Sequence, residues 1–365
     1  MHLKKQSKNK MHLKKIIKTI IIILVFLFPF SAFSNWQGSG TDTDPYLIFD
    51  IVDLQAVADS VSKGNIFNAN FHFKLMSDIP GPVDFLIGAG SPTNRNWNHK
   101  FDGNGFKITL LRSGGLFPRS STNSVIKDLS VDGIIYNASG ITGGITNRNR
   151  NIISNVTNYT SVQQVAVGWT AGIVGVNEEG ASVIGSINNG KIVSNTSYLA
   201  GIAAESVGIV SNCINTGSII STPNVPLDPG ENSRVGGIVG SISGTTPASQ
   251  VVVESNINTG FVQGEVYVGG IVGANFISTP PVSILINKNI NYGLIRGDMR
   301  IGGILGGNQL GFDNRNTATI SNNSNFGVVI GNSNVGCIVG IRQHLMGTII
   351  IENNHYDKRM SGDDD

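Results

Sequence analysis

The phrase that decides the fold of this 365-residue chain returns at nearly constant intervals. Its clearest copies read Gly236-Gly237-Ile238-Val239-Gly240, Gly269-Gly270-Ile271-Val272-Gly273 and Gly302-Gly303-Ile304-Leu305-Gly306. We take the second residue of each copy as its anchor, and the eight anchors are Gly115, Gly144, Gly172, Gly201, Gly237, Gly270, Gly303 and Cys337. Successive anchors lie 29, 28, 29, 36, 33, 33 and 34 residues apart, which indicates an internal repeat.

A second phrase, of the type Ile257-Asn258-Thr259-Gly260, lies between the anchors. Its asparagines form the series Asn188, Asn215, Asn258, Asn291 and Asn325. Two residues before each of them stands a small, mostly polar residue, in the series Ser186, Cys213, Asn256, Asn289 and Asn323. Each repeat therefore holds several short β-branched runs broken by Gly and Asn, and it shows no helical period.

Repeats of about 30 residues built from short strands cannot bury an apolar face alone, so they stack into a solenoid. We predict an all-β parallel β-helix in which equivalent residues lie roughly 4.7–4.9 Å apart. The asparagines would then form a ladder of side-chain amides, each donating to the next. The glycines would serve corners with positive φ and close backbone approaches. A propeller or sandwich is the alternative, but either would need antiparallel hairpins and more than 7% aromatic residues.

The N-terminus has the order of a secretory signal peptide. Lys14, Lys15 and Lys18 precede an apolar run at 20–28, and a small-residue cleavage site ends at Ser34. We therefore expect residues 1–34 to be removed on export, which leaves a secreted or cell-surface protein with no stable membrane span. The apolar run is too short to cross a bilayer comfortably, although an uncleaved anchor is the alternative.

The exported chain is predicted to have three parts. Residues 35–70 form an N-terminal cap, because Asp50 can cap a short helix whose apolar residues follow helical spacing. Residues 71–353 form the parallel β-helix, with about eight coils. Residues 354–365 form a polar C-terminal tail. The two thiols, Cys213 and Cys337, lie several repeats apart, so we expect two packed thiols and no disulfide.

The charge of the exported chain argues against nucleic acid as a partner. The whole chain carries 26 basic and 24 acidic residues, but residues 1–34 hold seven lysines and no acid. This leaves 19 basic against 24 acidic residues in the rest, a net charge of −5. A basic face is what nucleic-acid binding requires.

Several segments carry a resemblance to bacterial secreted proteins with the GLUG motif, a repeat of surface adhesins. The opening at 38–48 resembles that family, as do the helix-like stretch at 53–58 and the first strands at 71–79 and 101–108. The phrase Asn353-Asn354-His355-Tyr356-Asp357-Lys358 is similar to the one that often ends its array. The resemblance covers most of the exported chain. It implies a right-handed parallel β-helix that is exported and usually serves attachment.

Few residues suggest chemistry, and we predict no catalytic set, no metal site and no cofactor. There is no His-Glu-x-x-His pair, no zinc quartet and no phosphate-binding loop. Arg296, Asp298 and Arg300 would share one face of a strand, where they could bind a uronate, but an exposed charge pair without function is the more favoured interpretation. Asp298 and Asp313 are the one carboxylate pair worth inspecting for glycoside hydrolysis.

Two tryptophans, Trp97 and Trp169, are the best candidates for stacking on sugars, although burial between coils is more common for such residues. Asp102-Gly103-Asn104-Gly105 could supply oxygen ligands for calcium, but this phrase is first of all a turn former. We therefore expect a non-enzymatic adhesin-like module that presents a β-helical face to a glycan or an extracellular or cell-surface protein. The alternatives are a polysaccharide lyase or hydrolase, and a structural spacer.

Overall fold

The structure is a computed structural model that describes residues 36–63, 70–88, 96–195, 198–222, 233–243, 249–277, 282–310, 314–344 and 347–358. The chain divides into two compact units, and the second, Gly38–Asp365, contains all the elements described below. The expected signal peptide at 1–34 lies outside the described residues. Within the described part, none of the helices has the length and apolar character needed to cross a bilayer.

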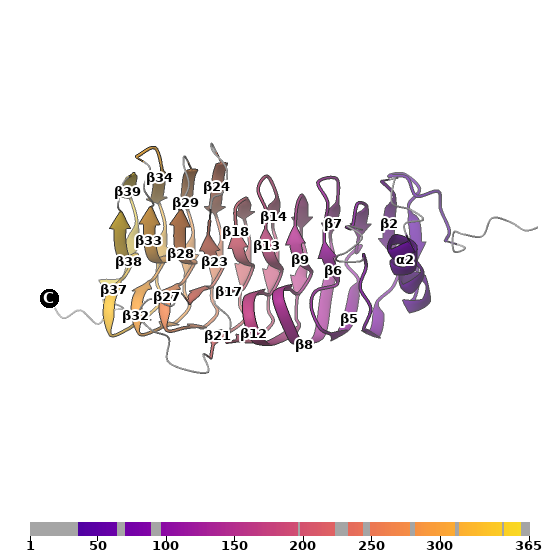
Figure 1. The fold of residues 1–365 in the computed structure, drawn as a ribbon, viewed down its shortest axis with the longest axis horizontal. Helices are drawn as coiled ribbons and strands as arrows, with labels where there is room; N and C mark the ends of the chain where they lie inside the picture. Colours follow the sequence, from indigo (N-terminus) through magenta and orange to yellow (C-terminus); the bar gives the residue numbers. More distant parts are fainter. Residues whose placement is uncertain are drawn as a thin grey trace, which may run out of the picture. The chain divides into compact units, whose positions relative to one another are not determined.

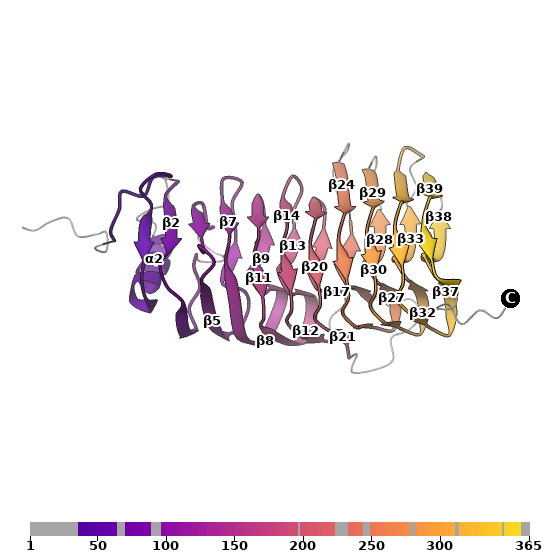
Figure 2. The same ribbon diagram turned by 180° about the vertical axis from the view of Figure 1, so that it is seen from behind.

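Unit 2 is a parallel β-solenoid (Figures 1 and 2), as the repeat predicted. Strands of one coil pair in parallel with the equivalent strands of the next coil, for example β24 with β29 and β28 with β33. One sheet has eleven strands: β1 (Tyr46–Ile48), β2 (His72–Leu75), β4 (Lys100–Asp102), β7 (Val125–Lys127), β10 (Ile152–Ser154), β14 (Ser182–Ile184), β19 (Ile209–Ser211), β24 (Ser249–Glu254), β29 (Val282–Asn287), β34 (Thr317–Ser321) and β39 (Thr348–Glu352).

A second sheet has eight strands: β6 (Phe117–Arg119), β9 (Thr146–Asn149), β13 (Val174–Asn177), β18 (Ala203–Ser206), β23 (Val239–Ile242), β28 (Val272–Ile277), β33 (Leu305–Leu310) and β38 (Val339–His344). Each of the eight anchors lies two residues before one of these strands, so the repeat marks the entry to this sheet in every coil. The prediction of about eight coils is confirmed.

The remaining strands form parallel columns that connect the first sheet to the second. In the first coils this side is made by β3 (Ile79–Val83), β5 (Lys107–Arg112) and β8 (Ser130–Gly143). One later column is β11 (Thr157–Asn158), β15 (Ile187–Asn188), β20 (Ile214–Asn215), β25 (Ile257–Asn258), β30 (Ile290–Asn291), β35 (Ser324–Asn325) and β40 (His355–Tyr356).

Two more columns begin at the long strand β12 (Ser161–Ala171), which pairs with both. One continues through β16 (Ile192–Ser194), β21 (Ile219–Ser221), β26 (Val262–Gln263), β31 (Ile295–Arg296) and β36 (Val329–Ile330). The other continues through β17 (Tyr198–Ala200), β22 (Arg234–Gly236), β27 (Val266–Gly269), β32 (Met299–Gly302) and β37 (Ser333–Gly336).

The asparagine ladder exists and is one member longer than predicted, because it begins at Asn158. Each side-chain Nδ2 donates to the Oδ1 of the next ladder residue, over 2.7–2.8 Å, from Asn158 through Asn188, Asn215, Asn258 and Asn291 to Asn325. The same Nδ2 atoms donate to a carbonyl two residues ahead, as from Asn258 to Gly260 over 3.1 Å. The ladder residues have at most 1% of their surface exposed. The buried amides therefore satisfy one another and hold the turn of each coil.

The anchor glycines from Gly144 to Gly303 are required by this ladder. A Cβ on Gly237 would lie 2.2 Å from the carbonyl oxygen of Gly270 and 2.5 Å from Cγ of Asn258. A Cβ on Gly270 would meet Asn291 in the same way. These anchors do not have positive φ, so close approach alone explains them, and the prediction that they serve positive-φ corners is corrected.

Cys337 occupies the anchor position where this constraint ends. In the last coil the residue in register with Asn325 is Tyr356, which is exposed and outside the ladder. Cys337 and Tyr356 line the same cavity. Among the described residues no ladder amide lies against this anchor, so a side chain larger than hydrogen fits there.

The corner after the eleven-stranded sheet adopts the left-handed backbone conformation in successive coils. Its φ values lie between 51° and 60°, at Asp128, Asn155, Gly185, Asn212, Ser255, Lys288, Asn322 and Asn353. Asn and Asp tolerate this conformation better than other residues with a Cβ. Glycine thus supplies one member of this column, and asparagine supplies half of it.

The predicted helix covers the first coils. Helix α2 (Ile51–Lys63) begins after Asp50, whose Oδ1 accepts hydrogen bonds from the backbone of Val52 and Asp53 over 2.9 and 3.0 Å. Its buried face contains the residues expected from the spacing, Leu54, Val57, Ala58 and Val61. The sheets extend beyond the predicted β-helix boundaries at 71 and 353, because β1 precedes this helix and β40 lies in the expected tail.

The second polar column is also hydrogen-bonded, and it buries one thiol. Asn256 donates to Oδ1 of Asn289, which donates in turn to Asn323, each over 3.0 Å. Cys213 occupies the same column, where its backbone donates to Oδ1 of Asn256 over 2.9 Å. Both Cys213 and Cys337 are free thiols, as expected.

Removing one ladder amide should cost stability out of proportion to its size. In Asn258→Ala, the side chain of Asn215 loses one of its two acceptors and the backbone of Gly260 loses two partners. We expect a loss of about 2–4 kcal/mol in the free energy of unfolding, measured by urea denaturation. The control is Thr259→Ala, which removes an exposed side chain and should change stability by less than about 0.5 kcal/mol. Equal losses in both variants would contradict the role of the ladder.

The buried thiol predicts a pH dependence. Burial raises the pKa of Cys213 from 9.0 to about 12. Between these values the unfolded chain has lost the thiol proton while the folded chain keeps it. Above pH 9 the free energy of unfolding of the wild-type protein should therefore fall by about 1.4 kcal/mol per pH unit more than that of Cys213→Ala, which lacks the thiol. Urea denaturation of both proteins at pH 8–10.5 tests this, and parallel curves would refute it.

Candidate binding face

Trp97 is a core residue. Its side chain is fully buried, and its ring contacts those of His99, Phe117 and Phe73 at centroid distances of 4.9, 5.1 and 5.7 Å. A ring enclosed by other aromatic rings has no free face for a sugar. Trp97 therefore packs between coils, and it is removed from the candidate sugar-stacking residues.

Arg296, Asp298 and Arg300 do not form the common face expected of one strand. Strand β31 ends at Arg296 and β32 begins at Met299, so Asp298 lies in the break between them. Arg300 has a φ of 63°, and its guanidinium lies 4.6 Å from the centroid of the Tyr267 ring. Asp298 accepts a hydrogen bond from a neighbouring asparagine side chain. The prediction of a shared face is therefore corrected, and Asp313 lies outside the described residues.

Asp102 acts as a turn former and an ion-pair partner. Its Oδ1 accepts a hydrogen bond from the backbone of Asn104 over 2.7 Å, and its Oδ2 lies 2.8 Å from Nζ of Lys127. This geometry explains the Asp-Gly-Asn-Gly phrase by local backbone structure.

Arg300 belongs to a column of aromatic and arginine side chains that runs along the solenoid. The strand register places Trp169, Tyr198, Arg234, Tyr267 and Arg300 at one position of five successive coils. The rings of Trp169 and Tyr198 lie 5.8 Å apart, and the guanidinium of Arg234 lies 4.6 Å from the centroid of Tyr198. Contacts of this kind between a guanidinium and the face of an aromatic ring are favourable cation–π interactions.

Arg234 is the more enclosed of the two arginines of this aromatic–arginine column. It is 5% exposed, its guanidinium also lies 4.6 Å from the ring of Phe276, and it donates to Oγ of Ser241 over 2.8 Å. Burial lowers the pKa of the Arg234 guanidinium, and the nearby Tyr198 opposes this shift. Because Phe276 and Ser241 belong to β28 and β23, the column packs against the outer side of the eight-stranded sheet.

A charged cluster occupies the same sheet, toward its N-terminal strands. Three arginines converge on one carboxylate, that of Glu178. Arg119 and Arg148 lie 3.0 and 3.4 Å from Oε1, and Arg150 lies 2.9 Å from Oε2. The arginine side chains are 36–38% exposed, and that of Glu178 is 20% exposed. The guanidinium donors therefore remain accessible to a ligand while Glu178 orders them.

A cavity of about 500 Å³ opens beside this cluster. Its lining combines donors, acceptors and two valines: Thr122, Arg148, Arg150, Val176, Glu178, Glu179, Glu205, Val207 and Ser243. Glu205 accepts a hydrogen bond from the hydroxyl of Ser243. Such a lining can exchange hydrogen bonds with a polyhydroxylated or acidic ligand.

The cavity and the aromatic–arginine column adjoin one another on β18. Tyr198 and Trp169 are both half-buried and pack against Ala204. The next residue, Glu205, lines the cavity. Arg234 of the column donates to Ser241, which pairs with Glu205 in the strand register, so the column reaches the strand position beside the cavity. Together they form what we call the candidate binding face.

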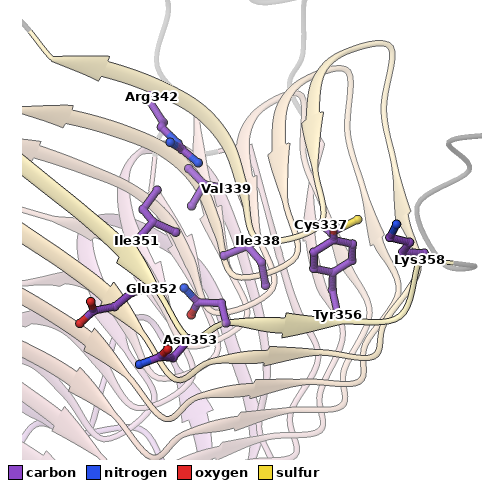
Figure 3. Close-up of a pocket in the computed structure, with 10 residues that line it drawn as sticks. Cys337, Ile338, Val339, Arg342, Ile351, Glu352, Asn353, Tyr356 and Lys358 are labelled. Carbon is purple, nitrogen blue, oxygen red and sulfur yellow. The ribbon is translucent and has the colours of Figure 1, made fainter. Parts of the chain in front are cut away.

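A second cavity, of about 530 Å³, lies at the last coil (Figure 3). Its lining includes Ile338 and Val339, which are only half-buried, whereas the equivalent residues of the previous coil, Ile304 and Leu305, are fully buried. This cavity is therefore the interior of the solenoid where the described coils end. Its rim carries the polar side chains of Arg342, Glu352, Asn353, Asn354 and Lys358.

The sequence analysis identified Trp169 but missed the charged cluster. Arg119 and Arg148 pair on β6 and β9, and their separation of 29 residues equals the repeat period. Charged residues one period apart could have been recognised as neighbours. Glu178 could not, because its place depends on the turn that follows β13.

Comparison with known proteins identifies no family for this chain. No family model matches the chain, and no curated protein matches it either. One solved structure is similar over 87% of this chain and 86% of its own, with 15% sequence identity and a TM-score of 0.49. It is described as a "putative immunoglobulin A1 protease" from Bacteroides ovatus. The resemblance to the GLUG proteins stays a prediction.

The charged cluster should depend on Glu178. In Glu178→Gln the three guanidiniums lose their shared counter-charge, and we expect a loss of about 1–2 kcal/mol in the free energy of unfolding at low salt. The loss should shrink in 1 M NaCl, because salt screens the remaining repulsion between the arginines. Denaturation at both salt concentrations measures it. Glu352→Gln, at an exposed glutamate of β39, is the control, and a salt-independent loss would contradict the electrostatic cause.

Proposed function

We propose that this protein is a secreted or cell-surface adhesin-like module that binds its ligand without transforming it. The observation that carries the proposal is the candidate binding face. There, Arg148, Arg150 and several carboxylates line a cavity. The column that holds half-buried Trp169 and Tyr198 reaches this part of the sheet through Arg234, which donates to Ser241 beside Glu205. Aromatic rings and paired polar groups together are the chemistry that recognises a sugar ring and its substituents.

A glycan is the ligand class that this face favours. Hydroxyl groups can donate to the carboxylates of Glu178 and Glu205 and accept from the guanidiniums of Arg148 and Arg150. A uronate carboxylate or a sulfate could bind an arginine in a bidentate manner. An extracellular or cell-surface protein with an acidic loop is the second candidate. The predicted export of the chain supports either partner.

The enzymatic alternative loses the shared face of Arg296, Asp298 and Arg300 on which it was based. A lyase acting through Arg296, Asp298 and Arg300 would require these side chains to converge, and Arg300 instead packs on Tyr267. Within the cavity, Glu178 is engaged by three arginines and Glu205 by Ser243. These carboxylates act as acceptors in an ion-pair and hydrogen-bond network. A structural spacer is the remaining alternative.

The test is binding of the purified protein to an immobilised panel that contains polygalacturonate, alginate, heparin, a neutral β-glucan, fibronectin and collagen. Arg148→Gln combined with Arg150→Gln should weaken binding of the best ligand at least about tenfold, since two charge-assisted contacts are lost. Arg342→Gln, at an exposed arginine on β38 of the same sheet, should leave binding unchanged.

The same experiment separates the alternatives. Saturable binding with no loss of ligand over hours supports the adhesin-like function. Binding followed by depolymerisation would move the assignment to a carbohydrate-active enzyme. The absence of any binding that depends on the arginines would contradict the proposed face and favour a spacer.

A further inference from the structure

A second surface, separate from the candidate binding face, lies on the strand columns that hold the asparagine ladder. In two successive coils the outward positions beside the ladder are apolar. Tyr292 and Phe326 directly follow the paired residues Asn291 and Asn325. Leu294 and Val328 directly precede the paired residues Ile295 and Val329. We call Tyr292, Leu294, Phe326, Val328 and Ile330 the apolar patch.

The exposed fractions of these side chains are large for apolar residues. They are 52% for Tyr292, 40% for Leu294, 44% for Phe326, 37% for Val328 and 48% for Ile330. Together they expose on the order of 400 Å² of apolar surface, which is within the roughly 300–600 Å² of the largest apolar patch on a typical monomer, a patch that is often functional.

The patch is not a consequence of the repeat. The same outward positions hold Asn189 and Lys191 in one earlier coil, and Thr216 and Ser218 in the next. The inward residues of all these coils stay the same in character, because the ladder and the buried aliphatic residues continue unbroken. The solenoid therefore folds with polar residues at these positions, and its stability does not require the apolar ones.

The geometry of the patch does not suit a sugar. The rings of Tyr292 and Phe326 stack on one another, with centroids 5.4 Å apart and an interplanar angle of 20°. Stacking on a sugar needs a ring face that is directed outward, whereas rings stacked between successive coils direct their edges outward. None of the cavities described above is lined by a patch residue. A ligand would therefore meet a ridge of ring edges and aliphatic groups.

A cation borders the patch. Arg296 pairs with Ile330 in the strand register and is exposed. Within the described part of the chain, its guanidinium lies within 4.0 Å of no carboxylate. An exposed arginine at the margin of an apolar surface selects partners that place a carboxylate opposite it.

We propose that the apolar patch docks a protein partner through a short apolar segment that carries an acidic residue opposite Arg296. The apolar side chains of that segment lie across Tyr292, Phe326 and Val328, and its carboxylate pairs with Arg296. Such an interface has an apolar centre and a charged rim. This surface uses none of the residues of the candidate binding face, so the two interactions are independent.

The size of the patch argues against a second copy of this chain as the occupant. A stable homodimer buries about 800 Å² or more on each partner, which is roughly twice the exposed area of the patch. A short segment matches the available area, and its affinity would fall in the range of transient interactions.

The test uses random 12-residue peptides displayed on phage and selected on the immobilised wild-type protein. Peptides recovered after counter-selection against Tyr292→Ser/Phe326→Ser are synthesised, and their Kd values are measured by fluorescence anisotropy. We expect apolar peptides that contain Asp or Glu, with affinities at least about tenfold weaker for the double variant. Arg296→Gln should weaken the same peptides several-fold and remove their salt dependence.

Tyr159→Ser is the matched control. Tyr159 occupies the same position of an earlier coil and is 53% exposed, but it lies outside the patch. This variant should bind the peptides as the wild type does.

Three results would overturn the proposal. One is that no selected peptide depends on Tyr292 and Phe326. Another is a dimer in sedimentation experiments that the double variant dissociates, which would make a second copy the occupant. The third is loss of glycan binding in the double variant with the Arg148 and Arg150 face intact, which would make the patch a sugar site.

Discussion

The close fit between the asparagine ladder and the anchor glycines is the constraint on which the rest of the solenoid depends. Each ladder amide is buried, so it must find donors and acceptors inside the protein. It finds them in the next coil and in a carbonyl two residues ahead, as Asn258 does with Asn291 and Gly260. The backbone at the anchor residues must then lie close to the ladder, and at Gly237 even a Cβ would collide with Asn258. Both repeated phrases thus follow from one contact.

Because the interior is fixed in this way, the outer surface can vary without cost to the fold. One outward column changes from Lys191 and Ser218 to Leu294 and Val328 while the ladder beside it continues unchanged. Another column carries Trp169, Tyr198 and Arg234 in successive coils. A solenoid of this kind offers long faces on which distinct binding chemistries can lie side by side.

Several charged side chains of this protein are fixed by ion pairs or by packing on aromatic rings. Glu178 orders three arginines, and Arg234 and Arg300 pack on aromatic rings. Such arrangements favour a rigid surface whose donors are preorganised, because the side-chain entropy of long arginines is lost on folding and not on binding. Preorganised donors suit recognition of a ligand, which agrees with the function proposed for the candidate binding face.

The sequence by itself determined the parallel β-solenoid, the anchors, the ladder and the capping helix. These features are periodic or local, and stacking converts equal spacing along the chain into contact in space. Only the tertiary structure decided the burial of Trp97, the break between Arg296 and Arg300, and the convergence of three arginines on Glu178. These outcomes depend on the shape of each coil, on a bulge or turn that shifts a side chain from one face to another, and on neighbours from other coils. The period pairs Arg119 with Arg148, but the other contacts combine residues from different positions of different coils, so the period does not encode them.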